Sequence, residues 1–269
     1  MTKQTRALGS ASVLLLAVLA LYGSAQPTAA TIIQNSVEAN AADWKAMPDY
    51  DYFERDQESD GSTKTYAELM ILGSRYERLV AVNGKPLSSG ENTQQEQKLQ
   101  AEISVRRQES PQQRRERISD YERGRKRDYR MMDQLTKAFN FTLIGEQKLG
   151  SNNVYVLKAT PRPDYQPPNM EMQALKGMQG KLWIDKNTFQ WVKVEAQVIH
   201  PVSIEGFLAE VEPGTRFELD KGPVADGIWL PTHYVMKARA KILFFIPHRT
   251  QADETYYDFH KIQGNAAPE

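Results

Sequence analysis

The strongest signal for metal chemistry is the run DQESDG at positions 56–61. Oxygen-bearing side chains alternate along this run and a glycine follows at the sixth position, as at the start of a calcium-binding loop. However, Glu58 stands at the third position, where Asp or Asn is usual, and Ala67 stands at the twelfth, where a bidentate Glu should close the site. A polar loop between two strands explains the run better, and we predict no metal site.

Catalytic groups do not occur at the spacings that known chemistries need. The sequence has no cysteine, no G-x-S-x-G nucleophile motif and no phosphate-binding loop. Its four histidines, His200, His233, His248 and His260, form no zinc motif, although the last two could approach each other across a hairpin. We therefore predict no catalytic residue and no cofactor. An enzyme built from distant acidic residues, such as a hydrolase of envelope lipids or glycans, leaves no local signature and stays open.

Anion binding is the third chemistry to consider, in the segment from Arg106 to Arg130, which holds ten basic and five acidic residues with two interleaved tyrosines. A solvated helix with alternating charges is the favoured explanation. The alternative is contact with phospholipid headgroups, a lipopolysaccharide-like anion or an acidic partner protein. For such a contact the candidate residues are Arg114, Arg115 and Arg117.

The N-terminus has the order of a secretory signal peptide. Lys3 and Arg6 precede the apolar run ASVLLLAVLAL, and small residues follow it. This run is shorter than the about 20 residues that a membrane span needs. We therefore expect residues 1–30 to contain a cleaved signal, with the cut after Ala25 or Ala30.

The remainder, residues 31–269, is expected to be a single domain in the periplasm. Without a cysteine it can be neither lipidated nor stabilised by disulfides, so it should be soluble and held by an apolar core. The whole chain has 34 basic and 34 acidic residues, and removing the signal leaves a slight acidic excess. This charge balance and the predicted export exclude nucleic acid as a partner.

Strand-like segments on both sides of the basic segment predict an antiparallel sheet. The pair Asn83-Gly84 in the first β-rich region, Asp49 to Leu87, is typical of a hairpin turn. From FNFTLIGEQ onward, strands recur with turn signals and without long intervening helices, which favours antiparallel pairing. The fold class is therefore mainly β, with a helical insertion.

The insertion covers about residues 91–139 and is predicted to form two helices. Ser110-Pro111 has the order of an N-cap followed by proline at the first helical position. Apolar residues then recur with a period of about 3.6 up to Phe139. This apolar period is interrupted at Gly124-Arg125.

Two predicted strands each have one apolar face without catalytic or metal-binding side chains. In WVKVEAQV, residues 191–198, the even-numbered residues point one way and Trp191, Lys193, Glu195 and Gln197 point the other. The strand THYVMKARAKI has a similar face of small and medium side chains. Such faces can curve around an apolar ligand or pack as core beneath helices. The candidate ligand residues are Val192, Val194, Ala196, Val198, Tyr234, Met236, Ala238 and Ala240.

Three motifs carry a resemblance to a known family. They are GKLWID at residues 180–185, the stretch from Val192 to Glu195, and DGIWLP at residues 226–231. The chain from about Tyr66 to Ile262 resembles the LolA/LolB-like lipoprotein-carrier superfamily, which includes RseB-like sensor proteins. This resemblance implies a curved antiparallel half-barrel with the helical insertion packed on its concave face, around an apolar cavity for acyl chains.

The resemblance therefore implies a periplasmic carrier that sequesters an acyl chain or a lipidated protein in an apolar cavity and makes transient contact with a membrane surface. The alternative is an envelope sensor or scaffold that uses the same fold to bind a protein partner. The absence of cysteine excludes the membrane-anchored receptor type. The sequence leaves the identity of the cargo open.

Overall fold

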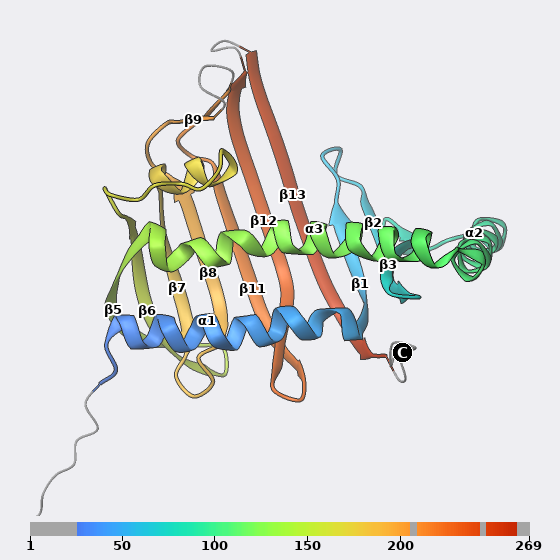
Figure 1. The fold of residues 1–269 in the computed structure, drawn as a ribbon, viewed down its shortest axis with the longest axis horizontal. Helices are drawn as coiled ribbons and strands as arrows, with labels where there is room; N and C mark the ends of the chain where they lie inside the picture. Colours follow the sequence, from blue (N-terminus) through green and yellow to red (C-terminus); the bar gives the residue numbers. More distant parts are fainter. Residues whose placement is uncertain (1–25, 205–208, 243–245, 263–269) are drawn as a thin grey trace, which may run out of the picture.

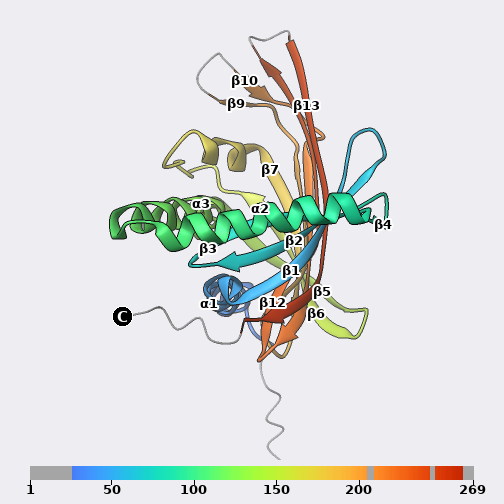
Figure 2. The same ribbon diagram turned by 90° about the vertical axis from the view of Figure 1, so that its right-hand side faces the viewer.

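The computed structural model describes residues 26–204, 209–242 and 246–262. Within these ranges the chain forms one antiparallel sheet with helices on one face (Figures 1 and 2). The predicted signal peptide falls mainly on residues 1–25, which lie outside the described residues.

The strands follow the order of the sequence. They are β1 (Tyr50–Gln57), β2 (Thr63–Ile71), β3 (Ser74–Val82), β4 (Lys85–Pro86), β5 (Phe139–Leu149), β6 (Asn152–Pro161), β7 (Met178–Asp185), β8 (Trp191–Val198), β9 (Val202–Ile204), β10 (Ala209–Val211), β11 (Arg216–Ala225), β12 (Ile228–Ile242) and β13 (Ile246–Lys261). The helices are α1 (Ala29–Ala46), α2 (Ser89–Gln108) and α3 (Pro111–Ala138), with 3₁₀ turns η1 (Met47–Asp49) and η2 (Glu171–Gly177).

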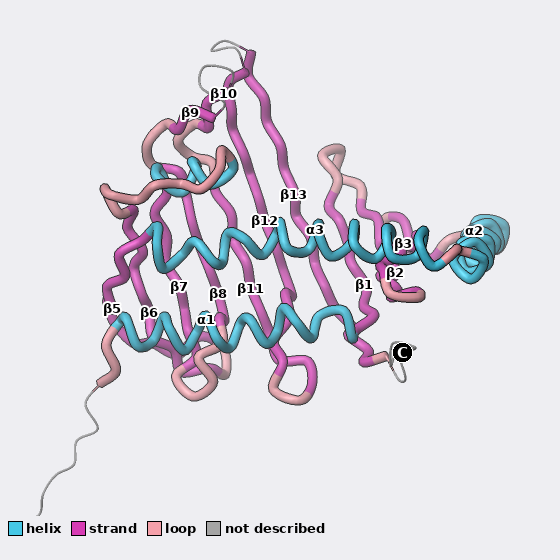
Figure 3. The backbone as a smooth tube through the Cα atoms, in the orientation of Figure 1, coloured by secondary structure: helices cyan, strands magenta, loops and turns pink. Residues whose placement is uncertain are grey.

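The sheet has the order β4-β3-β2-β1-β13-β12-β11-β8-β7-β6-β5, with β10 paired to β12 and β9 paired to β10. Its end strands β4 and β5 do not pair with each other, so the sheet curves without closing (Figure 3). Because β13 lies between β12 and β1, the last strand joins the N-terminal meander to the rest of the sheet. The predicted curved antiparallel sheet with helices on its concave face is confirmed.

Local sequence explains several turns of the sheet. Asn83 and Gly84 connect β3 to β4 with φ angles of 52° and 68°, the left-handed conformation that a type I′ turn requires at both positions. The DQESDG run closes the hairpin between β1 and β2, and the Asp60 carboxylate accepts a hydrogen bond from the backbone N–H of Ser62 at 2.8 Å. The prediction of a polar hairpin loop is therefore confirmed.

Capping interactions fix the starts of both helices in the insertion. Ser88 and Glu91 form a capping box at the start of α2, and Ser110 and Gln113 form another at the start of α3. The two predicted helices are confirmed, and α3 continues through Gly124 and Arg125, where the apolar period is interrupted, to Ala138. One glycine costs a helix about 1 kcal/mol, which packing along a long helix can offset.

The helices take different places on the sheet. Figure 1 shows α1 and α3 crossing the same face side by side, with α2 beyond the β3 end. α2 is fixed there by Arg106, which is 5% exposed and donates hydrogen bonds to the carbonyls of Ile71, Ser74 and Arg75. α1 was not predicted as a helix, and its N-cap is Thr28, which accepts from the backbone N–H of Thr31 at 3.2 Å.

The main core lies between the helices and the half of the sheet formed by β5–β8. Its buried members include Ile32 of α1, Ala138 of α3 and Leu175 of η2, packed over Leu157 and Ile184. A second, smaller cluster lies on the opposite face of the sheet, around Trp183 and Trp229. The sheet is therefore most thoroughly covered at its β5–β8 side.

Candidate functional site

The helix-facing side of β8, β11 and β12 brings together most of the predicted ligand residues. The register places Ala196, Phe217 and Met236 in one row across these strands. Val194, Leu219 and Tyr234 form the next row. Directly paired residues of antiparallel strands share a face, and Val194 belongs to the core beneath the helices, so both rows face the helices.

Two residues of this face, Phe217 and Leu219, were not among the predicted site residues. Both are half-buried and pack against the main core. They alternate with charged residues in the segment RFELD, which is the period-2 signal of a half-buried strand. The signal was therefore present, but the strand-face prediction did not include this segment.

Val192 lies on the wrong face for a ligand residue, which corrects the prediction. It packs with Trp183 and Trp229 in the small cluster opposite the helices. The cause is an irregularity in the pairing of β7 with β8, where Trp183 pairs with Lys193 but Ile184 pairs with Trp191. The extra residue reverses the alternation, so that Trp191 faces the helices instead.

The remaining predicted residues differ in how deeply they are covered. Val194 and Val198 are buried in the core, whereas Ala196, Tyr234, Met236, Ala238 and Ala240 are half-buried. Ala238 and Ala240 lie toward the end of β12 that leads to β13. Residues Phe217, Tyr234, Met236, Ala238 and Ala240 thus form a half-buried strip, called here the β12 strip.

α3 supports this arrangement by bridging the sheet. It contacts β3 near one end and β5 and η2 near the other, and it also contacts α1. Between the helices, Trp44 of α1 stacks on Tyr129 of α3 with ring centroids 4.7 Å apart. The Arg125 guanidinium lies 4.5 Å from the centre of the Trp44 ring and donates to the Trp44 carbonyl. The two helices therefore form one cover over the concave face.

A buried polar network fixes α1 to the sheet. The Asp43 carboxylate accepts hydrogen bonds from Lys221 Nζ at 2.6 Å, from Gln190 Nε2 at 3.1 Å and from the backbone N–H of Trp229 at 3.0 Å. The Asp43 and Lys221 side chains are only 3% and 7% exposed. Burial lowers the pKa of Lys221, while the Asp43 charge opposes that shift.

Acidic residues and tyrosines gather on the helix-facing side next to the β12 strip. Glu254 of β13 lies directly opposite Tyr234 in the register, and β1 adds Glu54 and Asp56. Burial, and then repulsion from neighbouring carboxylates, raises the pKa of Glu54 to about 8. Burial and repulsion from Glu77 raise the pKa of Glu68 to about 7. These carboxyl groups keep protons near neutral pH and can act as hydrogen-bond donors.

Metal ligands are not gathered in the described part of the chain. No three or more His, Asp or Glu side chains there are placed to hold an ion. The predicted approach of His248 and His260 across a hairpin is wrong, because both lie on the single strand β13, near its two ends.

The predicted contact residues Arg114, Arg115 and Arg117 do not form one exposed patch, which corrects that prediction. Arg117 donates to the Glu109 carboxylate at 2.6 Å, to Ser74 Oγ at 2.7 Å and to the Leu72 carbonyl at 3.1 Å. Arg114 is half-buried, and only Arg115 is exposed. The helical period turns positions 114 and 117 toward the sheet, and Arg117 therefore has a structural role.

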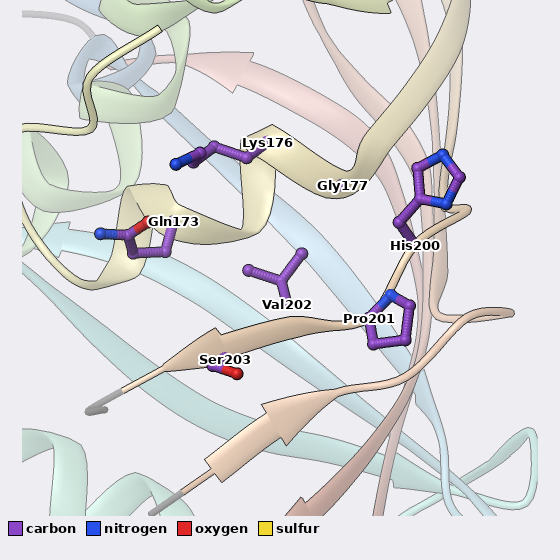
Figure 4. Close-up of a pocket in the computed structure, with 7 residues that line it drawn as sticks. All are labelled: Gln173, Lys176, Gly177, His200, Pro201, Val202 and Ser203. Atoms are coloured by element: carbon purple, nitrogen blue, oxygen red, sulfur yellow. The ribbon is translucent and has the colours of Figure 1, made fainter. Parts of the chain in front are cut away.

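Two surface pockets open away from the helix-facing side of the β12 strip. One of about 300 Å³ lies between η2 and β9, lined by Gln173, Lys176, Gly177, His200, Pro201, Val202 and Ser203 (Figure 4). A Cβ added to Gly177 would lie 2.3 Å from Val202 Cγ2, so this close packing needs glycine.

The other pocket, of about 500 Å³, is largely polar. It is lined by Lys158, Gln179, Gly180, Lys181, Glu195, Ala196, Gln197, Arg216, Phe217 and Glu218. Glu195, Arg216 and Glu218 alternate with helix-facing residues, so this pocket opens on the face away from the helices. Neither pocket is the apolar cavity that the resemblance implies.

No protein-family model and no curated protein matches the sequence. Similarity to solved structures was found. A LolA superfamily protein from Nitrosomonas europaea is 12% identical, with 89% of this chain and 95% of that chain covered and a TM-score of 0.34. For an outer membrane lipoprotein-sorting protein domain from Vibrio parahaemolyticus, the identity is 12%, the coverage 87% and 95%, and the TM-score 0.31.

The MucA/MucB complex of Pseudomonas aeruginosa gives 13% identity, coverage of 83% of this chain and 94% of that chain, and a TM-score of 0.25. These proteins are of the kind that the sequence motifs resemble. None of the described helices is both long enough and apolar enough to span a membrane.

Proposed function

We propose that this protein is a periplasmic carrier that binds the acyl chain of a lipid or lipidated protein along the β12 strip. The observation that carries this proposal is the half-buried state of Phe217, Tyr234, Met236, Ala238 and Ala240 on the concave face. These apolar residues continue the core beyond the part that the helices bury completely. A flexible apolar ligand can complete that coverage.

Binding needs no covalent step. Apolar burial contributes about 25 cal/mol per Å², so burying a few hundred Å² of an acyl chain supplies several kcal/mol. Small residues at Ala196, Ala238 and Ala240 leave room on the sheet that larger side chains would fill. The Glu54 carboxyl lies on the same face as the strip, two strands from β12, and its raised pKa allows it to donate a hydrogen bond to an ester or amide oxygen at the head of such a chain.

The periplasmic location follows from the predicted signal peptide, and α1 favours one of its two cleavage sites. A cut after Ala30 would remove Thr28, the N-cap of α1, together with the first residues of the helix. Losing such a cap costs about 1 kcal/mol. A cut after Ala25 leaves the cap and the whole helix intact, so we propose processing at that site.

The test of the carrier function places one arginine on each face of β12. Ala238→Arg puts a charged group into the β12 strip and should abolish retention of a co-purifying lipid or acylated peptide. Val235→Arg is the matched control, because Val235 lies on the opposite face between Glu218 and Asp253 in the register. Native mass spectrometry with organic extraction, on protein purified without detergent, measures the retained ligand.

Two results would contradict the carrier function. One is an unmodified protein that stays free of ligand after lipids are offered. The other is full retention by Ala238→Arg in a protein whose circular dichroism is unchanged. Either result would leave the β12 strip as ordinary core.

The second candidate is an envelope sensor or scaffold that binds a protein partner through α3. The supporting observation is that Arg115, Arg123, Lys126 and Arg130 are exposed on this helix. Reversing the charge of Arg115 and Arg123 should then abolish capture of an acidic partner and leave lipid retention unchanged. Arg117 is unsuitable for this test because of its contacts with Glu109 and Ser74.

A further inference from the structure

The sheet ends in two strands that differ in length and in protection. At one end, β4 has only two residues, one of which is Pro86. Short length and proline are devices that keep an edge strand from pairing with another chain. At the other end, β5 has eleven residues, and β6 is its neighbour in the sheet (Figure 1). Among the described residues, no strand pairs with the other side of β5.

The register shows which backbone groups of β5 point away from the sheet. The Arg162 N–H donates to the Ala138 carbonyl at 2.8 Å, directly before the first pair of the ladder, which contains Phe139. A bond at this place belongs to a pair whose two residues exchange no hydrogen bonds, and such pairs alternate along an antiparallel ladder. Phe141 and Leu143 therefore occupy equivalent places. Their N–H and carbonyl groups point outward, where an added strand can bond to them.

The two halves of β5 differ in how well they are protected against pairing. The second half follows a register shift and carries the charged residues Glu146 and Lys148. The Glu146 carboxylate also accepts hydrogen bonds from Lys186 Nζ at 2.5 Å and from Gln26 Nε2 at 2.8 Å. Bulges and charges are further devices that blunt an edge. The first half, FNFTL at residues 139–143, contains neither charge nor proline, so pairing is open there.

This half of β5 has one apolar face and one polar face. Phe141 and Leu143 are half-buried and pack against the main core beneath the helices. Asn140 and Thr142 alternate with them and are exposed on the other face. An apolar side chain of an added strand would cover the surface that Phe141 and Leu143 leave exposed. Ile144, at the register shift, is 49% exposed and adds apolar surface next to this segment.

A basic residue lies beside the polar face of the same half. Lys158 of β6 is exposed and lies between Thr142 of β5 and Lys181 of β7 in the register. Lys181 has Glu195 on its other side, whereas neither register partner of Lys158 is acidic. Neighbouring strands lie about 4.8 Å apart, so a long side chain of an added strand can reach Lys158 across the small Thr142. An acidic side chain would fit there.

We propose that residues 139–143 of β5 bind an extended segment of a partner protein, which joins the sheet as an additional strand and alternates apolar with acidic residues. The outward N–H and carbonyl groups select an extended backbone, as in other cases of strand addition. Phe141 and Leu143 select the apolar side chains, and Lys158 selects the acidic ones. The proposal goes beyond the carrier function and does not depend on its cargo.

A second copy of this chain fits the edge less well than an acidic segment does. If two copies paired through residues 139–143, each would place Asn140 or Thr142 beside the polar face of the other. Neither residue carries a charge that complements Lys158.

The test uses the chain from Gln26 onward, which holds every described element. The probe is a fluorescein-labelled peptide of seven residues, alternately glutamate and valine, with both ends blocked, and binding is measured by fluorescence anisotropy. The unmodified protein should bind this peptide. It should bind much more weakly a peptide in which lysine replaces glutamate, and one in which the same residues form a glutamate block and a valine block. Methyl groups on alternate backbone nitrogens of the probe should abolish binding, because they remove its hydrogen-bond donors.

The decisive comparison is between Phe141→Pro and Phe141→Ala. Both remove the same aromatic ring, but only proline also removes the outward N–H. Proline is tolerated on an edge strand where the N–H faces solvent, so both proteins should keep an unchanged circular dichroism spectrum. Phe141→Pro should bind the glutamate–valine peptide about tenfold more weakly than Phe141→Ala, the effect of one lost hydrogen bond.

A charge reversal tests the acidic half of the proposal without touching the backbone. Lys158→Glu should reverse the preference, so that the lysine–valine peptide binds more tightly than the glutamate–valine peptide. Lys126→Glu makes the same change at an exposed position on α3 and should leave the preference as it is.

Amide hydrogen exchange measured by NMR locates the peptide independently of any substitution. Bound peptide should slow the exchange of the Phe141 and Leu143 amides. The Asn140 and Thr142 amides, which face β6, should change little.

Four results would overturn the proposal. The first is the absence of binding by the unmodified protein, and the second is equal binding by the proline and alanine variants. The third is protection of amides on another element instead of β5, which would place the peptide elsewhere. The fourth is a dimer in analytical ultracentrifugation that the peptide does not dissociate and that protects the same two amides, which would make a second copy the occupant of this edge.

Discussion

Asp43 connects three separate parts of the chain through one carboxylate. Its partners are Lys221, Gln190 and the backbone N–H of Trp229, and its side chain is 3% exposed. Removing one partner of a buried ion pair leaves the other charge uncompensated, which typically costs 3–5 kcal/mol. Asp43→Ala should therefore lower the free energy of unfolding by about 3–5 kcal/mol, measured by urea denaturation.

A second substitution distinguishes the cost of the unpaired charge from the cost of lost packing. Lys221→Met in the Asp43→Ala background removes the unpaired ammonium group and should restore part of the lost stability. A loss below about 1 kcal/mol in Asp43→Ala alone would show that the pair contributes no more than an exposed one.

The residues of this network show what single-sequence reasoning omits. Ser36, Asn40 and Asp43 are the polar residues that α1 buries, and burying polar residues weakens the apolar period that indicates a helix. Only their partners on distant strands make burial favourable, as when the indole N–H of Trp191 donates to Ser36 Oγ at 2.6 Å. Those partners cannot be read from the sequence, so α1 and its polar contacts were missed.

At the scale of elements, α3 runs unbroken through Gly124, where its apolar period is interrupted. A Cβ added there would have no atom within 4 Å. Alanine is favoured over glycine in a helix interior by up to about 1 kcal/mol. Gly124→Ala should therefore raise the free energy of unfolding by about 0.5–1 kcal/mol, measured by urea denaturation.

Gly73→Ala is the contrasting control for that substitution. Gly73 has a φ of 90°, and an added Cβ would lie 2.8 Å from Ile118 Cδ1. The same chemical change should there lower stability by more than about 1 kcal/mol. If Gly124→Ala also destabilised the protein, the continuity of α3 at that position would be in question.

The predicted elements succeeded where local chemistry decides them. Ser110-Pro111 starts α3, and Asn83-Gly84 turns β3 into β4. Strict alternation placed seven of the eight ligand candidates on one face and failed at Val192, because a pairing irregularity depends on the neighbouring strand β7. How completely the helices bury the β12 strip depends on where α1 and α3 cross the sheet. No local sequence pattern specifies these crossing positions.

At the scale of the whole molecule, the carboxyls of Glu54 and Glu68 link stability to pH. The pKa of Glu54 rises from 4.5 to about 8 and that of Glu68 from 4.5 to about 7, so the folded protein holds protons that the unfolded chain releases. Their contribution is complete below the unfolded pKa and is lost as pH rises through the folded values. The free energy of unfolding should therefore fall between about pH 4.5 and pH 8.

Urea unfolding across this range measures that dependence. Glu54→Gln combined with Glu68→Gln should flatten it and make the protein more stable at the alkaline end than the unmodified chain. Glu116→Gln, at an exposed position on α3, should leave the slope as it is. An unchanged slope in the double variant would assign the pH dependence to other groups.

The long-range contacts of α1 also affect the order in which the elements of the protein fold. Ser36 of α1 accepts a hydrogen bond from Trp191, 155 positions later in the sequence, and Asp43 accepts one from Trp229, 186 positions later. Contacts between residues this far apart in the sequence form late. Closing the long intervening chain costs conformational entropy before the contacts can stabilise the structure. Although α1 is synthesised before the strands of the sheet, it is therefore among the last described elements to dock. Until β12 has emerged, the part of the concave face that α1 covers stays exposed on the nascent chain and available to a chaperone.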